Sequence, residues 1–159
     1  MKKTLILGLG NPILSDDGVG IWVARALRGR ALPPSVFFAE ASIGGLRLLE
    51  IIAGYERVIL VDAICSPQGF PGEISLLQPQ DLKTSLHSGS AHDLSLSGAL
   101  KLGRELGMDI PPDLNIKIVA ICAEEVQTLG EKMTPAVEAS VPQAVEAVLE
   151  ILKEEKGSP

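Results

Sequence analysis

Two adjacent carboxylates, Asp16 and Asp17, lie in a glycine-rich segment that directly follows an apolar run near the start of the chain. A third carboxylate, Asp62, stands near the end of another apolar run, and His92 precedes a helical pattern. Two carboxylate oxygens and an imidazole nitrogen suit a divalent transition-metal ion, and three protein ligands leave coordination positions open. These residues therefore predict metal-assisted chemistry at a site built from Asp62, His92 and one member of the acid pair.

The elements around these residues decide whether they meet. A strand that runs into a loop holds the loop's side chains at the carboxyl edge of a sheet, where open α/β proteins bind ligands. If the strands before the acid pair and before Asp62 are parallel neighbours, their carboxylates emerge at the same edge. The N-terminus of a crossover helix, which His92 precedes, lies at that edge too.

Each of these residues also has a purely structural interpretation. Asp16 or Asp17 is a good N-cap for the helix that begins near Val19, but one cap needs only one carboxylate. Asp62 could cap a loop through backbone amides, although burial without a partner would be costly. The other histidine, His87, is interpreted as a solvated side chain.

Apolar runs of strand length alternate with helical patterns, which predicts an α/β protein with right-handed crossovers. The predicted strands are 4–9, 36–39, 58–63, 74–77 and 116–122, and the predicted helices are 19–28, 46–53, 94–106 and one that begins after Thr134. Residues 66–72 are too few for a crossover helix, so the third and fourth strands are expected to form a hairpin-like antiparallel pair. Pro142 is expected to kink the last helix, or to make it restart with Ser140 as cap.

The composition fits a single domain over residues 1–159, with residues 153–159 frayed. The chain is 46% hydrophobic and only 3% aromatic, as suits strands covered on both faces by helices. The formal net charge of −6 disfavours nucleic acid as a partner. No apolar run reaches membrane-spanning length, so the protein is expected to be soluble and intracellular. Cys65 and Cys122 are expected to be buried thiols.

Other catalytic motifs are missing from the sequence. It contains no GxSxG elbow, no HExxH helix and no lysine in the glycine-rich segment that could form a P-loop. The dinucleotide-binding fingerprint fails because Ile13 stands where its third glycine would be needed.

Residues 8–20 (GLGNPILSDDGVG) resemble the GxGNxLxxDDGxG signature of the hydrogenase maturation proteases. These endopeptidases trim the C-terminal extension from the large subunit of nickel-iron hydrogenases. Further matches lie along most of the chain: residues 44–45 (GG), 61–63 (VDA), 71–74 (PGEI), 90–94 (SAHDL) and 133–137 (MTPAV). The resemblance implies a three-layer α/β/α fold of the phosphorylase/hydrolase-like kind, with a five-stranded, mostly parallel mixed sheet.

The resemblance also implies a site and a substrate. The second acid of the pair, the aspartate ending the third strand and the loop histidine become Asp17, Asp62 and His92, as both metal-binding and catalytic residues. They would bind nickel carried by the precursor, and other divalent ions could substitute. Asp16 could exchange roles with Asp17, and His87 competes with His92. His92 is preferred because the residues that follow it, Asp93 and Leu94, match the loop pattern of the family. A monomeric, cytoplasmic endopeptidase of the aspartyl type is expected.

Three other functions compete with this interpretation. A peptidyl-tRNA hydrolase shares the GLGNP opening, but it would carry a histidine about a dozen residues later and a basic face. A non-catalytic maturation chaperone could bind a metal ion or a cationic peptide at the same acidic edge. Nucleotide binding ranks last, because two carboxylates at the helix N-terminus would repel phosphate.

Overall fold

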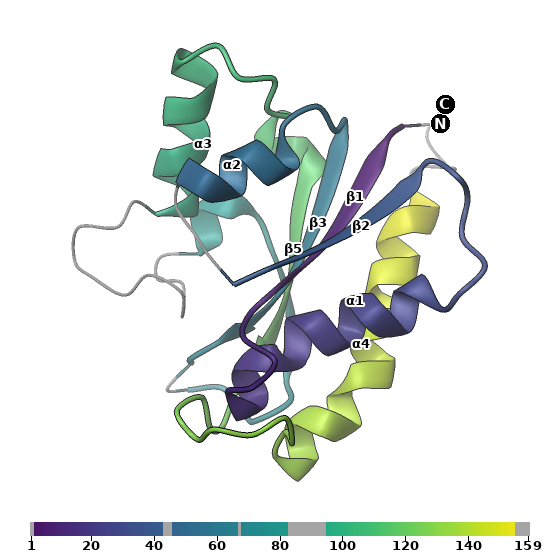
Figure 1. Ribbon diagram of the computed structural model, residues 1–159, viewed down its shortest axis with the longest axis vertical. Coiled ribbons are helices and arrows are strands. Elements are labelled where there is room, and N and C mark those ends of the chain that lie inside the picture. Colours follow the sequence, from purple (N-terminus) through teal and green to yellow (C-terminus); the bar gives the residue numbers. More distant parts are fainter. Residues whose placement is uncertain (1, 43–45, 67, 83–94, 155–159) are drawn as a thin grey trace.

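Five strands form one mixed sheet in the order β2-β1-β3-β5-β4 (Figure 1). The structure is a computed structural model that describes residues 2–42, 46–66, 68–82 and 95–154. The strands are β1 (Thr4–Leu9), β2 (Val36–Ala41), β3 (Arg57–Ile64), β4 (Ile74–Leu77) and β5 (Ile116–Cys122). All neighbouring pairs are parallel except β4, which lies antiparallel on β5 at one edge. The predicted mixed, mostly parallel sheet is confirmed.

Helices cover both faces of this sheet, so the protein has three layers (Figure 1). Helices α1 (Val19–Arg28) and α4 (Pro135–Glu154) pack on one face, and α2 (Leu46–Ile52) and α3 (Leu96–Glu105) pack on the other. Because both faces are covered, the central strands are apolar on both sides, and every residue of β1 is buried. The α/β/α architecture expected from the sequence is confirmed.

The expected hairpin between the third and fourth strands is wrong. Strand β5 lies between them, with Asp62 of β3 paired to Ala120 and Ser75 of β4 paired to the same residue from the other side. The physical reason is burial: all but one residue of β5 is buried, so it takes an interior position, whereas the short, half-exposed β4 can form an edge.

Helix α4 continues through Pro142 from Pro135 to Glu154. The expected restart at Ser140 is therefore wrong: Ser140 is buried, and its hydroxyl donates to the carbonyl oxygen of Val137 at 2.6 Å instead of capping a new helix. Within the described residues, no helix combines the length and the apolarity that crossing a bilayer requires.

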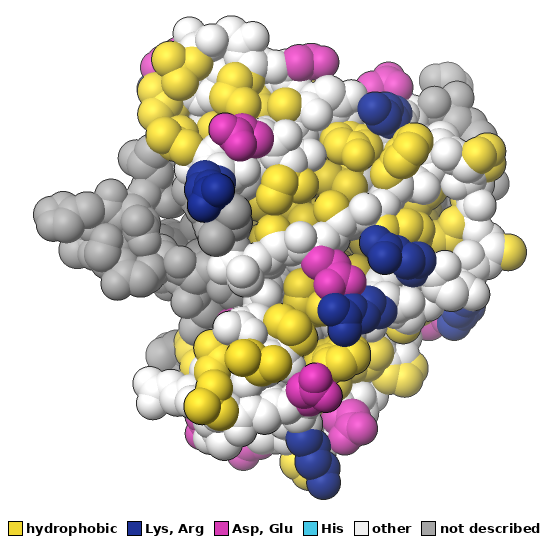
Figure 2. Space-filling view, viewed as in Figure 1, with side chains coloured by type: hydrophobic (Ala, Val, Ile, Leu, Met, Phe, Trp, Pro, Cys, Tyr) yellow, Lys and Arg dark blue, Asp and Glu magenta, His cyan; other side chains and the backbone are white. Residues whose placement is uncertain are grey.

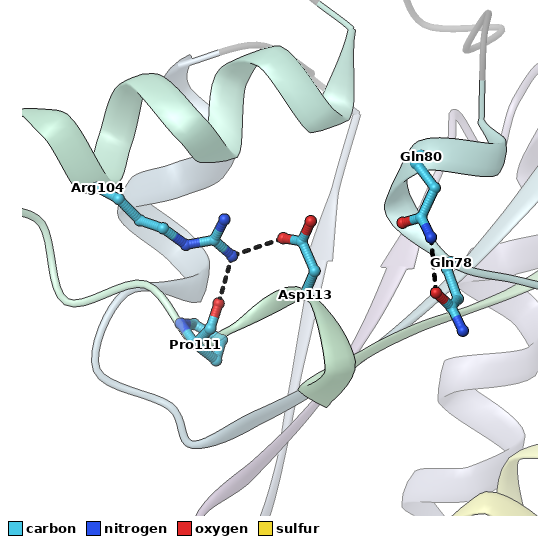
Figure 3. Close-up of polar contacts among 5 residues, drawn as sticks. All are labelled: Gln78, Gln80, Arg104, Pro111 and Asp113. Carbon is cyan, nitrogen blue, oxygen red and sulfur yellow. Dashed lines mark hydrogen bonds and ion pairs between the residues drawn. The ribbon is translucent and has the colours of Figure 1, made fainter.

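Helix α3 is fixed at the end remote from its N-cap, Ser95. Arg104 donates to the carbonyl oxygen of Pro111 at 2.6 Å and to the Asp113 carboxylate at 2.7 Å (Figure 3). The same figure shows Gln80 donating to Gln78 just after β4. The Arg104 contacts tie the end of α3 to the segment that leads into β5, so the N-terminus of α3 faces the opposite, carboxyl edge of the parallel strands.

Candidate active site at the carboxyl edge of the sheet

Asp62 lies at the carboxyl end of β3, in the middle of the sheet. It follows Val61, which is paired with Gly8 of β1, and it is itself paired with Ala120 of β5. Only 1% of Asp62 is exposed. Burying a carboxylate is expensive, so a protein retains one in such a place where it has a specific task.

Two glycines bring the acid pair close to this strand end. A Cβ atom on Gly20 would lie 2.2 Å from the carbonyl oxygen of Val61. A Cβ atom on Gly10, where φ is +139°, would lie 1.9 Å from the carbonyl oxygen of Asp17. Such distances are impossible for a real side chain, so only glycine lets the start of α1 pack directly on the ends of β1 and β3. The predicted meeting of the acid pair and Asp62 at one edge is thus supported.

Asp16 is a structural residue that joins two loops. Its carboxylate accepts four hydrogen bonds of 2.8 to 2.9 Å, from the backbone N–H groups of Glu124, Glu125 and Thr134 and from the Thr134 hydroxyl. Asp16 is 0% exposed. Its carboxylate holds the segment that joins β5 to α4 against the start of α1, and Figure 1 shows these segments in contact.

Asp17 makes different contacts from its neighbour. Its Oδ2 accepts a hydrogen bond of 2.9 Å from the backbone N–H of Asn11, and 6% of the residue is exposed. Neither carboxylate caps a helix: the short 3-10 helix η1 (Ser15–Gly18) and α1 both begin without a side-chain cap. The capping interpretation of the acid pair is therefore wrong. The bonds of Asp16 favour Asp17 as the member available to a ligand.

Backbone strain accompanies this arrangement. Ser15 has φ of +50°, a conformation that non-glycine residues adopt rarely. It is held there by hydrogen bonds from its N–H to Gly130 and from its hydroxyl to the carbonyl oxygen of Lys132. Strain of this kind costs on the order of 1–3 kcal/mol and is concentrated at functional sites.

Residues 123–134 form a wall of the site that the sequence did not reveal. The sequence pattern placed Thr134 only just before the last helix, yet its hydroxyl and its N–H both donate to Asp16. Glu125 lies in this wall, and the N–H groups of Gln127 and Thr128 lower the pKa of its carboxyl group. The motif at 133–137 was the one available signal, and it carried no information about the partner of Thr134.

The third predicted ligand, His92, lies outside the described residues, as does its competitor His87. Within the part of the chain that the structure describes, no three histidine, cysteine, aspartate or glutamate side chains are grouped to hold a metal ion. The described part of the site therefore supplies Asp17 and Asp62, and a metal ion there would need a ligand from another segment or from the substrate.

Cys65 borders this site, three residues after Asp62. The expectation that both cysteines are buried is wrong, because Cys65 is exposed while Cys122 is buried. Partial burial raises the pKa of the Cys65 thiol above its usual value, and the nearby Cys122 and Asp17 raise it further. The dependence on Asp17 makes Cys65 a reporter of charge at the site.

We expect the Asp17→Asn variant to alkylate faster at Cys65. Removing the negative charge of Asp17 lowers the pKa of the thiol, so more of the reactive thiolate is present at a given pH below that pKa. The measurement is the iodoacetamide rate at Cys65 from pH 7 to 10, followed by mass spectrometry. The rate profile should move to lower pH, whereas Asp113→Asn, at the other end of the sheet, should leave it unchanged. An unshifted profile for Asp17→Asn would show that the two side chains do not interact.

Comparisons with known proteins agree with this geometry. A family model described as hydrogenase maturation protease matches residues 21–151. The chain is 32% identical over 155 residues to the hydrogenase 2 maturation protease of Escherichia coli strain K12, covering 96% of this chain and 92% of that protein.

Solved structures show the same relationship. The hydrogenase maturating endopeptidase HybD from E. coli superposes with a TM-score of 0.80 at 30% identity, covering 96% of this chain and 93% of the other. For the [NiFe] hydrogenase maturation protease HybD from Thermococcus kodakarensis, the TM-score is 0.67 at 28% identity, with coverages of 94% and 98%. The family model, the relatives and the fold agree with the motifs at the carboxyl edge, and the chain belongs to the hydrogenase maturation proteases, a family of peptidases.

Proposed function

We propose that this peptidase removes the C-terminal extension of a nickel-iron hydrogenase large-subunit precursor, and that it recognises nickel already bound in that precursor. The observation that carries the proposal is the buried carboxyl group of Asp62 at the same edge of the sheet as the acid pair. A protein that binds its substrate through a metal ion needs negative charge held at a fixed place, and two strands and a glycine-packed helix fix it here.

In this proposal Asp17, Asp62 and His92 fill vacant coordination positions of the substrate's nickel. Asp62 is held by β3 and Asp17 by the turn that begins at Asn11, so the two carboxylates approach the ion with little loss of conformational freedom. The docked ion would lie beside the bond to be cleaved. It would act there as a Lewis acid, either by polarising the scissile carbonyl or by lowering the pKa of a bound water.

A carboxylate of the site could serve instead as the general base, as in an aspartyl-type peptidase. By either route, the enzyme's specificity for the nickel-loaded precursor follows from the presence of nickel in that precursor, because a precursor without nickel offers no ion to coordinate. We also take the enzyme to be a cytoplasmic monomer, as expected from the sequence, and other divalent ions to be possible substitutes for nickel.

The test compares cleavage of the precursor with and without nickel. We expect the wild-type enzyme to shorten the nickel-loaded precursor and to leave the unloaded one intact, because only the former presents a Lewis acid; gel electrophoresis and mass spectrometry of the released peptide provide the measurement. Equal processing of both forms would refute the role of nickel. The single variants Asp17→Ala, Asp62→Ala and His92→Ala should each lose cleavage, and an undiminished rate would remove that residue from the site.

A further inference from the structure

Two large aliphatic side chains lie exposed on neighbouring loops at the carboxyl edge. Ile13, in the glycine-rich segment, is 50% exposed, and Leu129, in the segment between β5 and α4, is 76% exposed. We call these two side chains the Ile13–Leu129 patch. In the lower left of Figure 2, where Figure 1 places these two loops, hydrophobic side chains lie at the surface near acidic ones.

Backbone hydrogen bonds join the two loops that carry the patch. The N–H of Gly130 donates to the carbonyl oxygen of Ile13 at 2.7 Å, and the N–H of Ser15 donates to that of Gly130 at 2.9 Å. Leu14 and Gly130 form a parallel β-bridge between the same loops. The four hydrogen bonds to Asp16 fix the wall nearby. The backbone that carries the two side chains is therefore fixed, and a backbone that is already ordered loses little entropy when a partner covers it.

The surroundings of the patch are acidic. Glu124, Glu125 and Glu131 lie in the same segment as Leu129, against one lysine, Lys132. Glu125 is fixed by the N–H groups of Gln127 and Thr128 and stays ionised. A partner with an apolar contact bordered by basic side chains would be complementary to this surface.

The patch is continuous with the acid pair. Ile13 is four residues before Asp17, and the N–H of Asp17 donates to the carbonyl oxygen of Leu14 at 3.0 Å. Asp17 and Asp62 are almost fully buried. A metal ion embedded in a folded protein can reach such carboxylates only if the surface around the ion lies against the loops that carry them, so the patch becomes covered in that complex.

We infer that the Ile13–Leu129 patch is a docking surface for the hydrogenase large-subunit precursor. This inference rests on the proposed function and adds a contact outside the metal site. Aliphatic side chains that a partner covers contribute to affinity because apolar surface leaves water, and contacts that border a reacting centre help to align it. The patch would thus set how tightly the precursor binds, while the carboxylates act on it once bound.

The test is the double variant Ile13→Ser/Leu129→Ser. Serine keeps the backbone hydrogen bonds and removes the apolar surface, and both positions are exposed, so the fold should be retained; circular dichroism checks this. The matched control is Leu106→Ser/Leu114→Ser, at positions 67% and 74% exposed at the other end of the sheet. We expect the first variant to raise KM and the Kd for nickel-loaded precursor tenfold or more, with kcat within about twofold of wild type. The control should match the wild type in all three.

Several outcomes would overturn the inference. An unchanged KM and Kd in the Ile13/Leu129 variant, while the wild type cleaves normally, would refute the docking surface and leave the proposed function standing. The docking surface would also be refuted if the Leu106/Leu114 control weakened binding as much as the Ile13/Leu129 variant does. A wild-type enzyme that sediments as a dimer and a patch variant that sediments as a monomer would assign the patch to self-association. A wild-type enzyme that neither binds nor cleaves the precursor would refute both proposals.

Discussion

Replacing Asp62 by asparagine is expected to abolish processing without unfolding the protein. The substitution keeps the size of the side chain and replaces a carboxyl group that is only 1% exposed, near the end of β3, by a neutral amide. A cation on the substrate would bind to the carboxylate, and the neutral amide of asparagine binds a cation much more weakly. The cleavage rate should therefore fall by at least about 10²-fold. The free energy of unfolding should change by no more than about 1 kcal/mol, because asparagine keeps the shape of the side chain and one of its two oxygens.

The measurements are single-turnover cleavage of nickel-loaded precursor and urea denaturation of the free enzyme. Asp109→Asn is the control, since Asp109 is exposed and lies at the other end of the sheet. A stability close to that of the wild type together with a loss of activity would identify Asp62 as a residue retained for function. If Asp62→Asn lost stability and kept its rate, the carboxylate would be a structural residue and the proposed metal contact would be wrong.

The position of Asp62 could be predicted because it depends on strand order between segments with strong patterns. The runs before the acid pair and before Asp62 are apolar throughout, which requires burial on both faces and interior places in a parallel sheet. Adjacent places for β1 and β3 then bring their carboxyl ends together. The helices on both faces followed from the same alternation of patterns.

The insertion of β5 between β3 and β4 could not be predicted from local sequence. The short segment between β3 and β4 is compatible with a hairpin, and only competition with a more completely buried strand decides against it. The effect of Pro142 depended in the same way on packing: α4 buries Val137, Val145 and Val148 on both sides of the proline, and these contacts offset one missing hydrogen bond.

The separate roles of Asp16 and Asp17 could not be predicted from the residue pattern itself, and only the family resemblance assigned the metal contact to Asp17. The two residues have the same chemistry and adjacent positions, so the pattern allows either as the ligand. What separates them is a set of N–H donors from Glu124, Glu125 and Thr134, more than 100 residues away along the chain. No spacing rule indicates which of two neighbouring carboxylates such a distant segment will bind.

Removing the Asp16 carboxylate should therefore destabilise the protein far more than removing that of Asp17. The Asp16→Ala variant leaves three backbone N–H groups and the Thr134 hydroxyl without their acceptor. Hydrogen bonds to a charged group contribute about 1.5–3 kcal/mol each, and they are not additive, so we expect a total loss of about 4 kcal/mol. For a chain of this size the melting temperature should fall by about 8–16 °C.

Asp17→Ala is the matched control, at the adjacent position and with the same chemical change. We expect it to cost no more than about 2 kcal/mol in urea denaturation and to lose cleavage of nickel-loaded precursor. We therefore expect opposite orders in the two measurements. Asp16→Ala shows the larger loss of stability, and Asp17→Ala shows the larger loss of cleavage rate at a temperature where both variants are folded. The opposite ranking would mean that Asp16 is the ligand. The two variants are expected to rank differently because four hydrogen bonds from the wall already hold the Asp16 carboxylate, three of them on Oδ2, so its main contribution is to the stability of the fold.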